Sequence, residues 1–352
     1  MATIRDVARE AGVSIATISR VFNASARVSE DTTSRVREVA ERMGYWPNGA
    51  ARSLITKRTN AIGVLLPDLY GEFFSEVIRG IDLTARREGY HLVVSSSHAD
   101  SNELLTALQT VRGRIDGLIV MAPDLADSAP FDESALRFPI VLVNPGFTTT
   151  RCASVSTDNV TGARAMVRHL AALGHREIAF IGGPPSNLDA RQRQQGYHEA
   201  LAELGLPATP GLEVTGSFTE SSGFEATREL LSRTRRLGAI FCANDCMAVG
   251  AMSALRQAGL RVPDDVALAG FDDISIASYL TPRLSSVRVE ASRLGERAVQ
   301  LLLGCLARVA APGPRQPMPH EILPTSLVVR ESSGATPDRV MQTANGSAVP
   351  SS

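Results

Sequence analysis

From residue 61 onward, short apolar runs alternate with longer stretches in which apolar residues recur every three or four positions. The short runs are typical of buried β-strands, and the longer stretches are typical of amphipathic helices. Strands and helices in alternation indicate parallel α/β sheets. We predict strands at 61–68, 91–97, 116–123, 139–145, 177–183, 237–245 and 265–273, and helices at 72–90, 193–206 and 246–260.

The number of these strands bears on the domain organisation. They are too many for one sheet, so we expect two similar lobes that divide near residues 155–158. A chain of 352 residues is also long enough for more than one packed domain. The fold class predicted for this part of the chain is therefore α/β, in two lobes.

The first sixty residues have a different pattern, that of three short helices. Thr3 and Asp6 have the spacing of a capping box at the start of the first helix, and Gly12 would end it. Ser14 and Ser29 can cap the second and third helices. Two helices joined by a tight turn and covered by a third form a helix-turn-helix arrangement. The three would pack through apolar stripes at helical spacing: Val7, Ala8 and Ala11; Ile18, Val21 and Phe22; and Val36, Val39, Ala40 and Met43.

The outward face of the second helix has residue types that suit DNA. At 100° per residue, Ala16 and Arg20 point away from the apolar stripe, and Ile15 protrudes from the first turn. A small residue permits close approach to bases, arginine can bond guanine, and an aliphatic group can touch the thymine methyl. Thr17 and Ser19 flank the stripe, where hydroxyls suit phosphate oxygens. The pattern alone fits an ordinary solvated helix face equally well.

The charge distribution favours a nucleic-acid partner for this segment. The whole chain has a net charge of −1, but residues 1–60 carry ten Lys and Arg against six Asp and Glu, a net charge of +4. The remainder has a net charge of −5. A basic N-terminal segment on an acidic body is expected when one small module binds phosphate.

The sequence gives no sign of a membrane, metal or nucleotide-cofactor protein. MATIRDVARE lacks the apolar segment of a secretory signal, and no stretch approaches the ~18 uncharged apolar residues of a membrane span. We therefore expect a cytoplasmic protein with no membrane partner. We expect no cofactor, since GxGxxG is absent, and no metal, since the cysteine spacing is unusual for zinc. Reduced, buried thiols are expected at Cys152, Cys242, Cys246 and Cys305.

The segment from Thr3 to Leu54 closely resembles the DNA-binding headpiece of the LacI/GalR family of bacterial transcription regulators. The matching run is TIRDVAREAGVSIATISRVFN followed by RVSEDTTSRVREVAERMGYWPNGAARSL. The resemblance continues through the body and covers roughly residues 2–330. It implies a helix-turn-helix headpiece at 1–46, a hinge helix and linker at 47–60, and a two-lobed effector-binding and dimerisation domain at 61–330. Residues 331–352, rich in Ser, Thr, Gly and Ala, are expected to be a disordered tail.

The family also implies roles in DNA binding. Residues matching Ile15, Ala16 and Arg20 read base edges in the major groove. The hinge helix forms on DNA, and Leu54 wedges into the central base step of a symmetric site. The implied partner is a palindromic double-stranded operator, bound by a homodimer. The residues implied to position the helices on phosphates are Thr3, Ser14, Thr17, Ser19, Asn23, Ser29 and Thr32.

The body is implied to have the fold of periplasmic sugar-binding proteins, with a ligand in a cleft between two lobes. Three strands would cross between the lobes, near 155–158, 286–291 and 321–324. Such a cleft lies at the carboxyl ends of strands, where carboxylate, guanidinium and amide groups can bond vicinal hydroxyls beside an aromatic face. Taken singly, each candidate could equally be a core, turn or surface residue. The candidates are Phe73, Phe74, Asn144, Arg193, Phe218, Asn244 and Asp272.

The resemblance also bears on the class of effector. A purine-binding member would carry Arg-x-Thr where this chain has Asn187-Leu188-Asp189. This difference argues for a sugar or a sugar phosphate as the small-molecule effector.

Three functions remain to be compared: a ligand-controlled repressor, an enzyme and a solute-binding protein for transport. The chain has no nucleophile elbow, P-loop or dinucleotide motif, which argues against an enzyme. The headpiece and the missing signal segment argue against a transport protein. We therefore predict a transcriptional repressor of carbohydrate metabolism genes.

Overall fold

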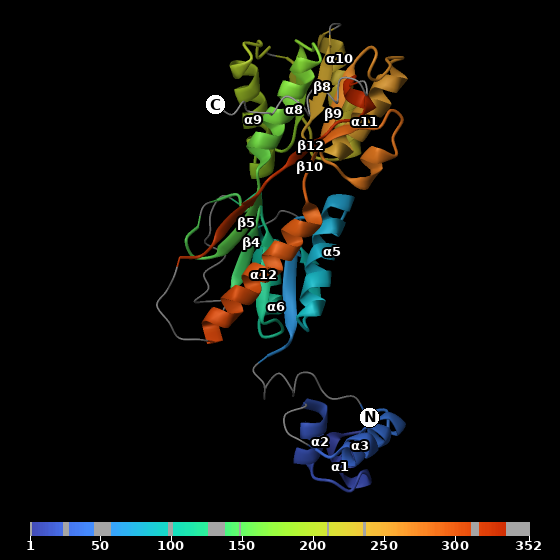
Figure 1. Ribbon diagram of the computed structural model, residues 1–352, viewed down its shortest axis with the longest axis vertical. Coiled ribbons are helices and arrows are strands. Elements are labelled where there is room, and N and C mark those ends of the chain that lie inside the picture. Colours follow the sequence, from blue (N-terminus) through green and yellow to red (C-terminus); the bar gives the residue numbers. More distant parts are fainter. Residues whose placement is uncertain are drawn as a thin grey trace, which may run out of the picture. The chain divides into compact units, whose positions relative to one another are not determined.

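A computed structural model describes residues 2–23, 28–45, 58–97, 101–125, 138–147, 149–209, 211–234, 237–310 and 317–335. The chain divides into two compact units, Met1–Thr59 and Asn60–Ser352, called the headpiece and the body below (Figure 1).

The headpiece contains three helices, α1 (Ile4–Glu10), α2 (Ile15–Asn23) and α3 (Glu30–Arg42). The predicted capping box is present, since Thr3 accepts from the backbone of Asp6 and the Asp6 carboxylate accepts from the backbone of Thr3. Gly12 follows α1 with φ of +65°, a conformation that glycine adopts without steric cost. The three apolar stripes form one small core, which confirms the predicted arrangement.

The first lobe of the body is a parallel sheet in the order β11-β5-β4-β3-β1-β2. Helices α5 (Glu72–Arg87) and α12 (Ala291–Ala310) pack on one side of it, and α6 (Ser101–Val111) packs on the other. The strands are β1 (Ala61–Leu66), β2 (His91–Ser96), β3 (Gly117–Met121), β4 (Ile140–Val143), β5 (Ala153–Thr157) and β11 (His320–Leu323).

The second lobe is a sheet in the order β12-β10-β9-β8-β6-β7, in which β12 runs antiparallel to β10. Helices α8 (Asn159–Ala172) and α9 (Leu188–Glu203) lie on one side, and α10 (Glu220–Arg233) and α11 (Asp245–Gln257) lie on the other (Figure 1). Short 3₁₀ segments follow at η2 (Ser275–Ser278) and η3 (Glu331–Ser333). The strands are β6 (Ile178–Gly182), β7 (Glu213–Thr215), β8 (Ala239–Cys242), β9 (Ala267–Asp272), β10 (Ser285–Arg288) and β12 (Ser326–Val328).

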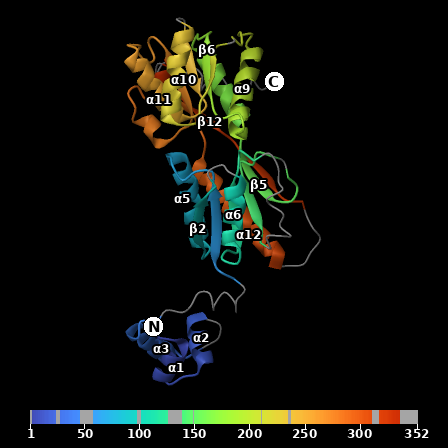
Figure 2. The ribbon, with the colours of Figure 1, turned by 180° about the vertical axis from the view of Figure 1, so that it is seen from behind.

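The chain passes between the two lobes three times, as Figure 2 shows. It leaves the first sheet after β5 to enter α8, returns from β10 into α12, and leaves again from β11 into β12. These places match the crossings expected near 155–158, 286–291 and 321–324. The two-lobed α/β fold class is therefore confirmed.

Several elements differ from the sequence prediction. Helix α9 begins at Leu188 rather than at residue 193, because the Asn187 side chain accepts from the Ala190 backbone and caps it there. Arg193 therefore lies within the helix and not in a segment leading into it. Helices α6, α8, α10 and α12 and strands β7 and β12 were not predicted.

The chain beyond Arg330 begins with an ordered segment. Ser332 and Ser333 in η3 are fully buried, and the Ser332 hydroxyl donates to the carbonyl of Leu268 at 2.6 Å. The first five residues of the expected disordered tail are thus packed on the second lobe. Residues 336–352 lie outside the described part of the chain.

The four cysteines differ in their burial. Cys152, Cys242 and Cys305 are buried, whereas Cys246 is half-buried. Within the described ranges, no helix is long and apolar enough to cross a membrane. The same ranges contain no group of three His, Cys, Asp or Glu residues arranged to hold a metal ion.

Candidate functional site

The outward face of α2 exposes the side chains that the sequence singled out for reading bases. Ile18 is fully buried beneath it, while Ile15 is 46% exposed and Ala16 and Arg20 are exposed. An apolar side chain this exposed at the start of a helix is available for contact with another molecule. Arg20 presents a guanidinium from the same face, one turn further along.

The hydroxyls predicted to meet phosphates gather at helix starts. Ser14 accepts from the Thr17 backbone at 3.1 Å, and Ser29 accepts from the Thr32 backbone at 3.4 Å. The Thr3 hydroxyl donates to the Asp6 carboxylate at 2.7 Å, which lowers the pKa of Asp6. The positive end of each helix dipole adds to the attraction for anions. The side chain of Asn23 and all of Leu54 lie outside the described residues, so their roles stay predictions.

Arg193 occupies the centre of a buried polar cluster in the second lobe. Its Nε donates to Asn159 Oδ1 at 2.9 Å, and Nη1 donates to the carbonyl of Ala243 at 2.6 Å. Its Nη2 lies 3.0 Å from Asp272 Oδ1, in an ion pair whose two side chains are 5% and 9% exposed. The guanidinium also stacks over the ring of Phe271, with Cζ 3.9 Å from the ring centroid.

Asp272 is the last residue of strand β9, has φ of 104°, and holds a carboxylate in a largely buried position. Burial raises the pKa of its carboxyl to about 6, although Arg193 beside it acts to lower the pKa and Asp189 acts to raise it. Asp272 Oδ1 faces Arg193 Nη2 at 3.0 Å, so the guanidinium is the partner that offsets the buried charge of this carboxylate.

Asn144 and Asp189 join the two lobes. Asn144, which follows β4 of the first lobe, donates from Nδ2 to Asp189 Oδ2 of α9 at 3.0 Å. Its Oδ1 accepts from the backbone of Thr157 at 3.0 Å. Asp189 accepts a second bond from Asn159 at 2.8 Å. A continuous network therefore runs from the end of β4, through Asp189 and Asn159, to Arg193.

Two further candidates position each other at the edge of this cluster. Asn244 caps α11 by accepting from the Met247 backbone at 2.9 Å, and it donates to the carbonyl of Phe218 at 3.0 Å. Phe218 has φ of 64°, and its ring centroid lies 6.0 Å from the Arg193 guanidinium. Its ring covers Gly183, where a Cβ would come within 2.3 Å of it.

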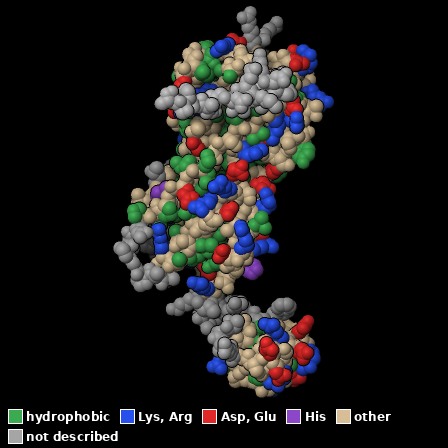
Figure 3. Space-filling view, in the orientation of Figure 1, with side chains coloured by type: hydrophobic (Ala, Val, Ile, Leu, Met, Phe, Trp, Pro, Cys, Tyr) green, Lys and Arg blue, Asp and Glu red, His purple; other side chains and the backbone are tan. Residues whose placement is uncertain are grey.

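The two phenylalanines of α5 have different surroundings. Phe73 packs against the cores of both lobes, and with Asp272 it lines an open groove of about 350 Å³ between α5 and residues 288–292. Phe74 packs edge-on against Phe73 and against the core of the first lobe. Figure 3 shows acidic and basic side chains intermingled on the face of the body that carries α5 and α12.

Comparison with known proteins decides the family. Residues 3–48 match the model for bacterial regulatory proteins of the lacI family, and residues 167–333 match that for a periplasmic binding protein-like domain. The ribose operon repressor of Escherichia coli K12 is 37% identical over 307 residues, which cover 86% of this chain and 92% of that protein. The chain belongs to the lacI family. It is a DNA-binding transcriptional regulator, as the sequence predicted.

Solved structures of lacI-family proteins agree with this assignment. The Lac repressor dimer bound to operator and the anti-inducer ONPF is 32% identical, with a TM-score of 0.82. That match covers 94% of this chain and 99% of that one. A LacI family regulator from Enterococcus faecium with bound ribose is 26% identical, with a TM-score of 0.68, over 77% of this chain and 98% of that one.

Two partners in the cluster of this lacI-family member, Asp189 and Asn159, were not identified from the sequence. Asp189 was noted only as a departure from a purine-binding motif, and Asn159 was not noted at all. Burial raises the pKa of Asp189, against the lowering effects of Arg193 and of its two asparagine donors. For Asp189, the available signal was Asn187 two positions earlier, a typical N-cap residue that places Asp189 in the first turn of α9.

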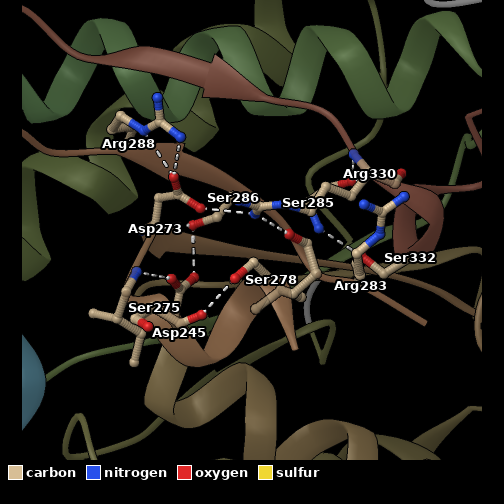
Figure 4. Close-up of polar contacts among 12 residues, drawn as sticks. Asp245, Asp273, Ser275, Ser278, Arg283, Ser285, Ser286, Arg288, Arg330 and Ser332 are labelled. Atoms are coloured by element: carbon tan, nitrogen blue, oxygen red, sulfur yellow. Dashed lines mark hydrogen bonds and ion pairs between the residues drawn. The ribbon is translucent and has the colours of Figure 1, made fainter. Parts of the chain in front are cut away.

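Asp273 and Asp245 form a second polar group, at the crossing segments (Figure 4). Asp273 binds Arg288 at the end of β10, at 2.8 Å, and Arg330 beyond β12, at 2.7 Å. Asp245 is buried and accepts from Ser286 at 2.6 Å and from the backbone of Ile274 at 2.9 Å. Burial raises the pKa of Asp245 well above its usual value. Consecutive residues at the end of β9 thus meet different partners, Arg193 for Asp272 and the crossing segments for Asp273.

Proposed function

We propose that this chain is a repressor of carbohydrate metabolism genes that binds a palindromic operator as a homodimer and responds to a sugar or sugar phosphate effector. The observation that carries the proposal is the combination, in one lacI-family chain, of an exposed Ile15, Ala16 and Arg20 face with a buried cluster around Arg193 and Asp272. The relatives' names support the carbohydrate assignment, since one is a ribose operon repressor and one solved neighbour holds ribose.

The buried cluster is suited to a polyhydroxylated ring. Arg193 and Asn244 can donate to hydroxyl oxygens, and Asp272 can accept from hydroxyl hydrogens. Phe73 and Phe218 offer apolar faces for the C–H side of a sugar. Phe73 comes from the first lobe and the others come from the second, so a ligand held by all of them would favour one lobe arrangement.

The binding of ligand and of DNA would then be coupled through the lobe arrangement. An effector can change operator affinity only by its own differential affinity for the two arrangements, which typically amounts to ~1–3 kcal/mol. Asp273 links the end of β9 to Arg288 and Arg330 on the crossing segments, so it is placed to relate the ligand cluster to the lobe angle.

We assign no catalytic activity to the chain. The curated relatives are transcriptional regulators, and the polar groups of the cluster bond one another rather than an activated nucleophile. We propose a cytoplasmic location, because a bacterial regulator of operator DNA works where the chromosome is.

The base-reading role of α2 predicts a specific loss of DNA affinity. Arg20→Ala is expected to weaken binding to the cognate palindrome by about 10- to 100-fold, because one bidentate contact per half-site is lost. Binding to random duplex should fall far less. The measurement is fluorescence anisotropy of both duplexes across a salt titration.

Arg42→Ala is the matched control for this variant. It removes an exposed headpiece arginine that pairs with Glu10 of α1 at 3.0 Å, and it changes the net charge equally. It is expected to retain the wild-type ratio of specific to random binding. Equal weakening of both duplexes by Arg20→Ala would contradict a base-reading role.

The dimer is proposed to form through the edge of the first lobe that α5 and β2 make. Leu83, Val93 and Val94 are 51%, 42% and 38% exposed there, which is unusual for large aliphatic residues. Leu83→Glu is expected to give a monomer at concentrations where the wild type is a dimer, and to reduce operator affinity. Ile322→Glu, on the opposite edge strand β11 at 70% exposure, is the matched control and should stay dimeric. Analytical ultracentrifugation measures both, and a dimeric Leu83→Glu would refute this surface.

A further inference from the structure

We infer that Glu72 is a latch between the two lobes, which holds them in the arrangement that the structure describes through a bond from the backbone N–H of Ser275. The inference goes beyond the proposed function because it names a residue that sets the lobe arrangement. It rests on the proposed function only for its consequence in operator binding, since the latch itself is tested without DNA or effector.

The latch is a hydrogen bond between residues that are 203 positions apart in the chain. Glu72, the first residue of α5 in the first lobe, accepts through Oε1 from the N–H of Ser275 at 2.6 Å. Ser275 is the first residue of η2 in the second lobe. The bond therefore joins the lobes directly, in addition to the three crossing segments.

Each end of this bond is fixed within its own lobe. Val77 and Ile81 of α5 are fully buried in the core of the first lobe. Ala277 of η2 is fully buried in the core of the second lobe, and Asp245 accepts from the N–H of Ile274 at 2.9 Å. Because each end is anchored, a change of lobe angle at this edge stretches or breaks the bond.

The contact is more than the capping of a local helix. A glutamate in the first turn usually serves its own helix, whose N-terminus attracts negative charge. Here Gly71 precedes α5 with φ of 101° and makes no side-chain cap bond, and the Glu72 carboxylate reaches a helix of the other lobe. The first N–H groups of a helix have no partner within it, so the Ser275 N–H depends on Glu72.

The setting of the bond suits a latch that a ligand can open. Glu72 and Ser275 line the groove of about 350 Å³ described above, together with Asp273 and Arg288. Water reaches a bond at such an edge and competes for both of its groups, so it stabilises one arrangement only modestly. A ligand that prefers another lobe arrangement can overcome a preference of this size.

A second bond between the lobes provides an independent reporter. Leu188, the first residue of α9, donates its N–H at 2.9 Å to the carbonyl of Pro123, which follows β3 of the first lobe. Helices α5 and α9 lie on opposite sides of the body in Figures 1 and 2. The Leu188 N–H also lacks a partner within its own helix, so its exchange with solvent reports the separation of the lobes there.

The test is hydrogen exchange of the full-length protein, read by mass spectrometry at single-residue resolution. Glu72→Ala is expected to speed exchange of the Ser275 N–H by about 10-fold and of the Leu188 N–H by about 3-fold or more. Glu72→Gln keeps an uncharged acceptor and should retain much of the protection at both. Rates are taken relative to the buried backbone of β8, which corrects for any general loss of stability.

Glu76→Ala is the matched control. Glu76 lies one turn further along α5, lines the same groove, and pairs with Arg79 of its own helix at 2.6 Å. Its substitution removes the same charge from the groove without touching a bond between the lobes. Exchange at Ser275 and Leu188 should stay as in the wild type.

The donor can be removed as well as the acceptor. Ile274 has φ of −64° and ψ of 156°, a conformation compatible with a following proline, and proline is tolerated at the first position of a helix. Ser275→Pro is expected to speed exchange at Leu188 as much as Glu72→Ala does, and the double variant should add nothing further. Both single variants should change operator affinity in the same direction, by about 3-fold or more.

The outcomes separate the latch from the proposed function. Faster exchange at Ser275 with unchanged exchange at Leu188 would overturn the inference, because Glu72 would then only cap η2. Unchanged exchange at both positions in Glu72→Ala, or additive effects of the two substitutions, would overturn it too. Faster exchange at both positions with unchanged operator affinity would uphold the latch and contradict the proposed coupling of lobe arrangement to DNA binding.

Discussion

The Asp272→Asn variant is expected to unfold at a higher temperature than the wild type at neutral pH and to lose its response to the effector. The two effects have one cause. Asp272 is buried with its charge only partly offset by Arg193, so its ionised form destabilises the ligand-free body. Asparagine keeps the shape of the side chain, removes the charge, and cannot supply the charged acceptor that a sugar hydroxyl would use.

The gain in stability from Asp272→Asn is expected to increase with pH. The pKa of Asp272 is about 6 in the folded protein and 3.8 for the exposed group, so the folded state binds the proton more tightly. The contribution of Asp272 to the stability of the wild type is fully present below about pH 4, and it is lost as the pH rises through about 6. The difference corresponds to about 3 kcal/mol at most, on the order of 1.4 kcal/mol for each pKa unit. The advantage of the variant should therefore be largest above pH 7 and should disappear below pH 4.

Thermal unfolding at a series of pH values, together with operator binding across an effector titration, measures both effects. Asp82→Asn serves as the control, because Asp82 forms an exposed ion pair and its removal should change neither property. A variant that is less stable than the wild type at pH 7.5 would contradict this prediction. It would show that the attraction between Arg193 and the Asp272 charge stabilises the body by more than the burial of that charge destabilises it. A variant that responds to effector at the wild-type concentration would place the binding site elsewhere.

The headpiece could be predicted from the sequence because its determinants are local. The capping box at Thr3 and Asp6, the glycine after α1 and the serine caps of α2 and α3 each involve residues within four positions of one another. The apolar stripes repeat at the helical period, so the buried faces follow directly. The central strands of the body could also be predicted, because buried parallel strands are continuous apolar runs in the sequence.

The polar cluster could be predicted only in part, because its partners are distant in the sequence. Arg193 and Asp272 were selected through the family resemblance and through their places near strand ends, but their ion pair joins α9 to β9. The importance of Asp189 depends on Asn144, which belongs to the other lobe. Neither periodicity nor spacing in the sequence predicts such a contact. From the sequence alone, Asp189 could be interpreted only as a residue near a helix cap. The roles of all these side chains in binding effector stay predictions.

Asp272 and Asp273 are adjacent in the sequence, and only the structure shows that their carboxylates have different partners. Both have positive φ, 104° and 54°, so the chain turns sharply at the end of β9 and sends the two carboxylates to different partners. One reaches Arg193 in the ligand cluster, and the other reaches Arg288 and Arg330 at the crossing segments. The residues FDD by themselves do not distinguish the two carboxylates, and Asp272 was chosen through the family resemblance. Such strained backbone at two consecutive residues is typical of functional sites.

The Arg193→Met variant is expected to destabilise the body by about 3–5 kcal/mol at neutral pH, the largest loss of stability among these substitutions. Methionine fills similar space but leaves Asp189 and Asp272 buried without their shared cation. It also removes the donors to Asn159 and to the carbonyl of Ala243. Operator binding without effector should persist wherever the protein remains folded, because Arg193 lies outside the headpiece, while the effector response should be lost.

The same charges give this loss a pH dependence that distinguishes it from simple loss of packing. Without Arg193, the pKa of Asp272 should rise above 6, because the cation now lowers it. Lowering the pH from 8 to 5 should protonate the uncompensated carboxyls and recover part of the stability, as measured by urea unfolding. Combining Arg193→Met with Asp272→Asn should cost less than Arg193→Met alone, since one unpaired charge is then removed. The control is Arg86→Met, at an exposed ion pair. A loss that is independent of pH and unchanged in the double variant would mean that Arg193 stabilises the lobe by packing alone.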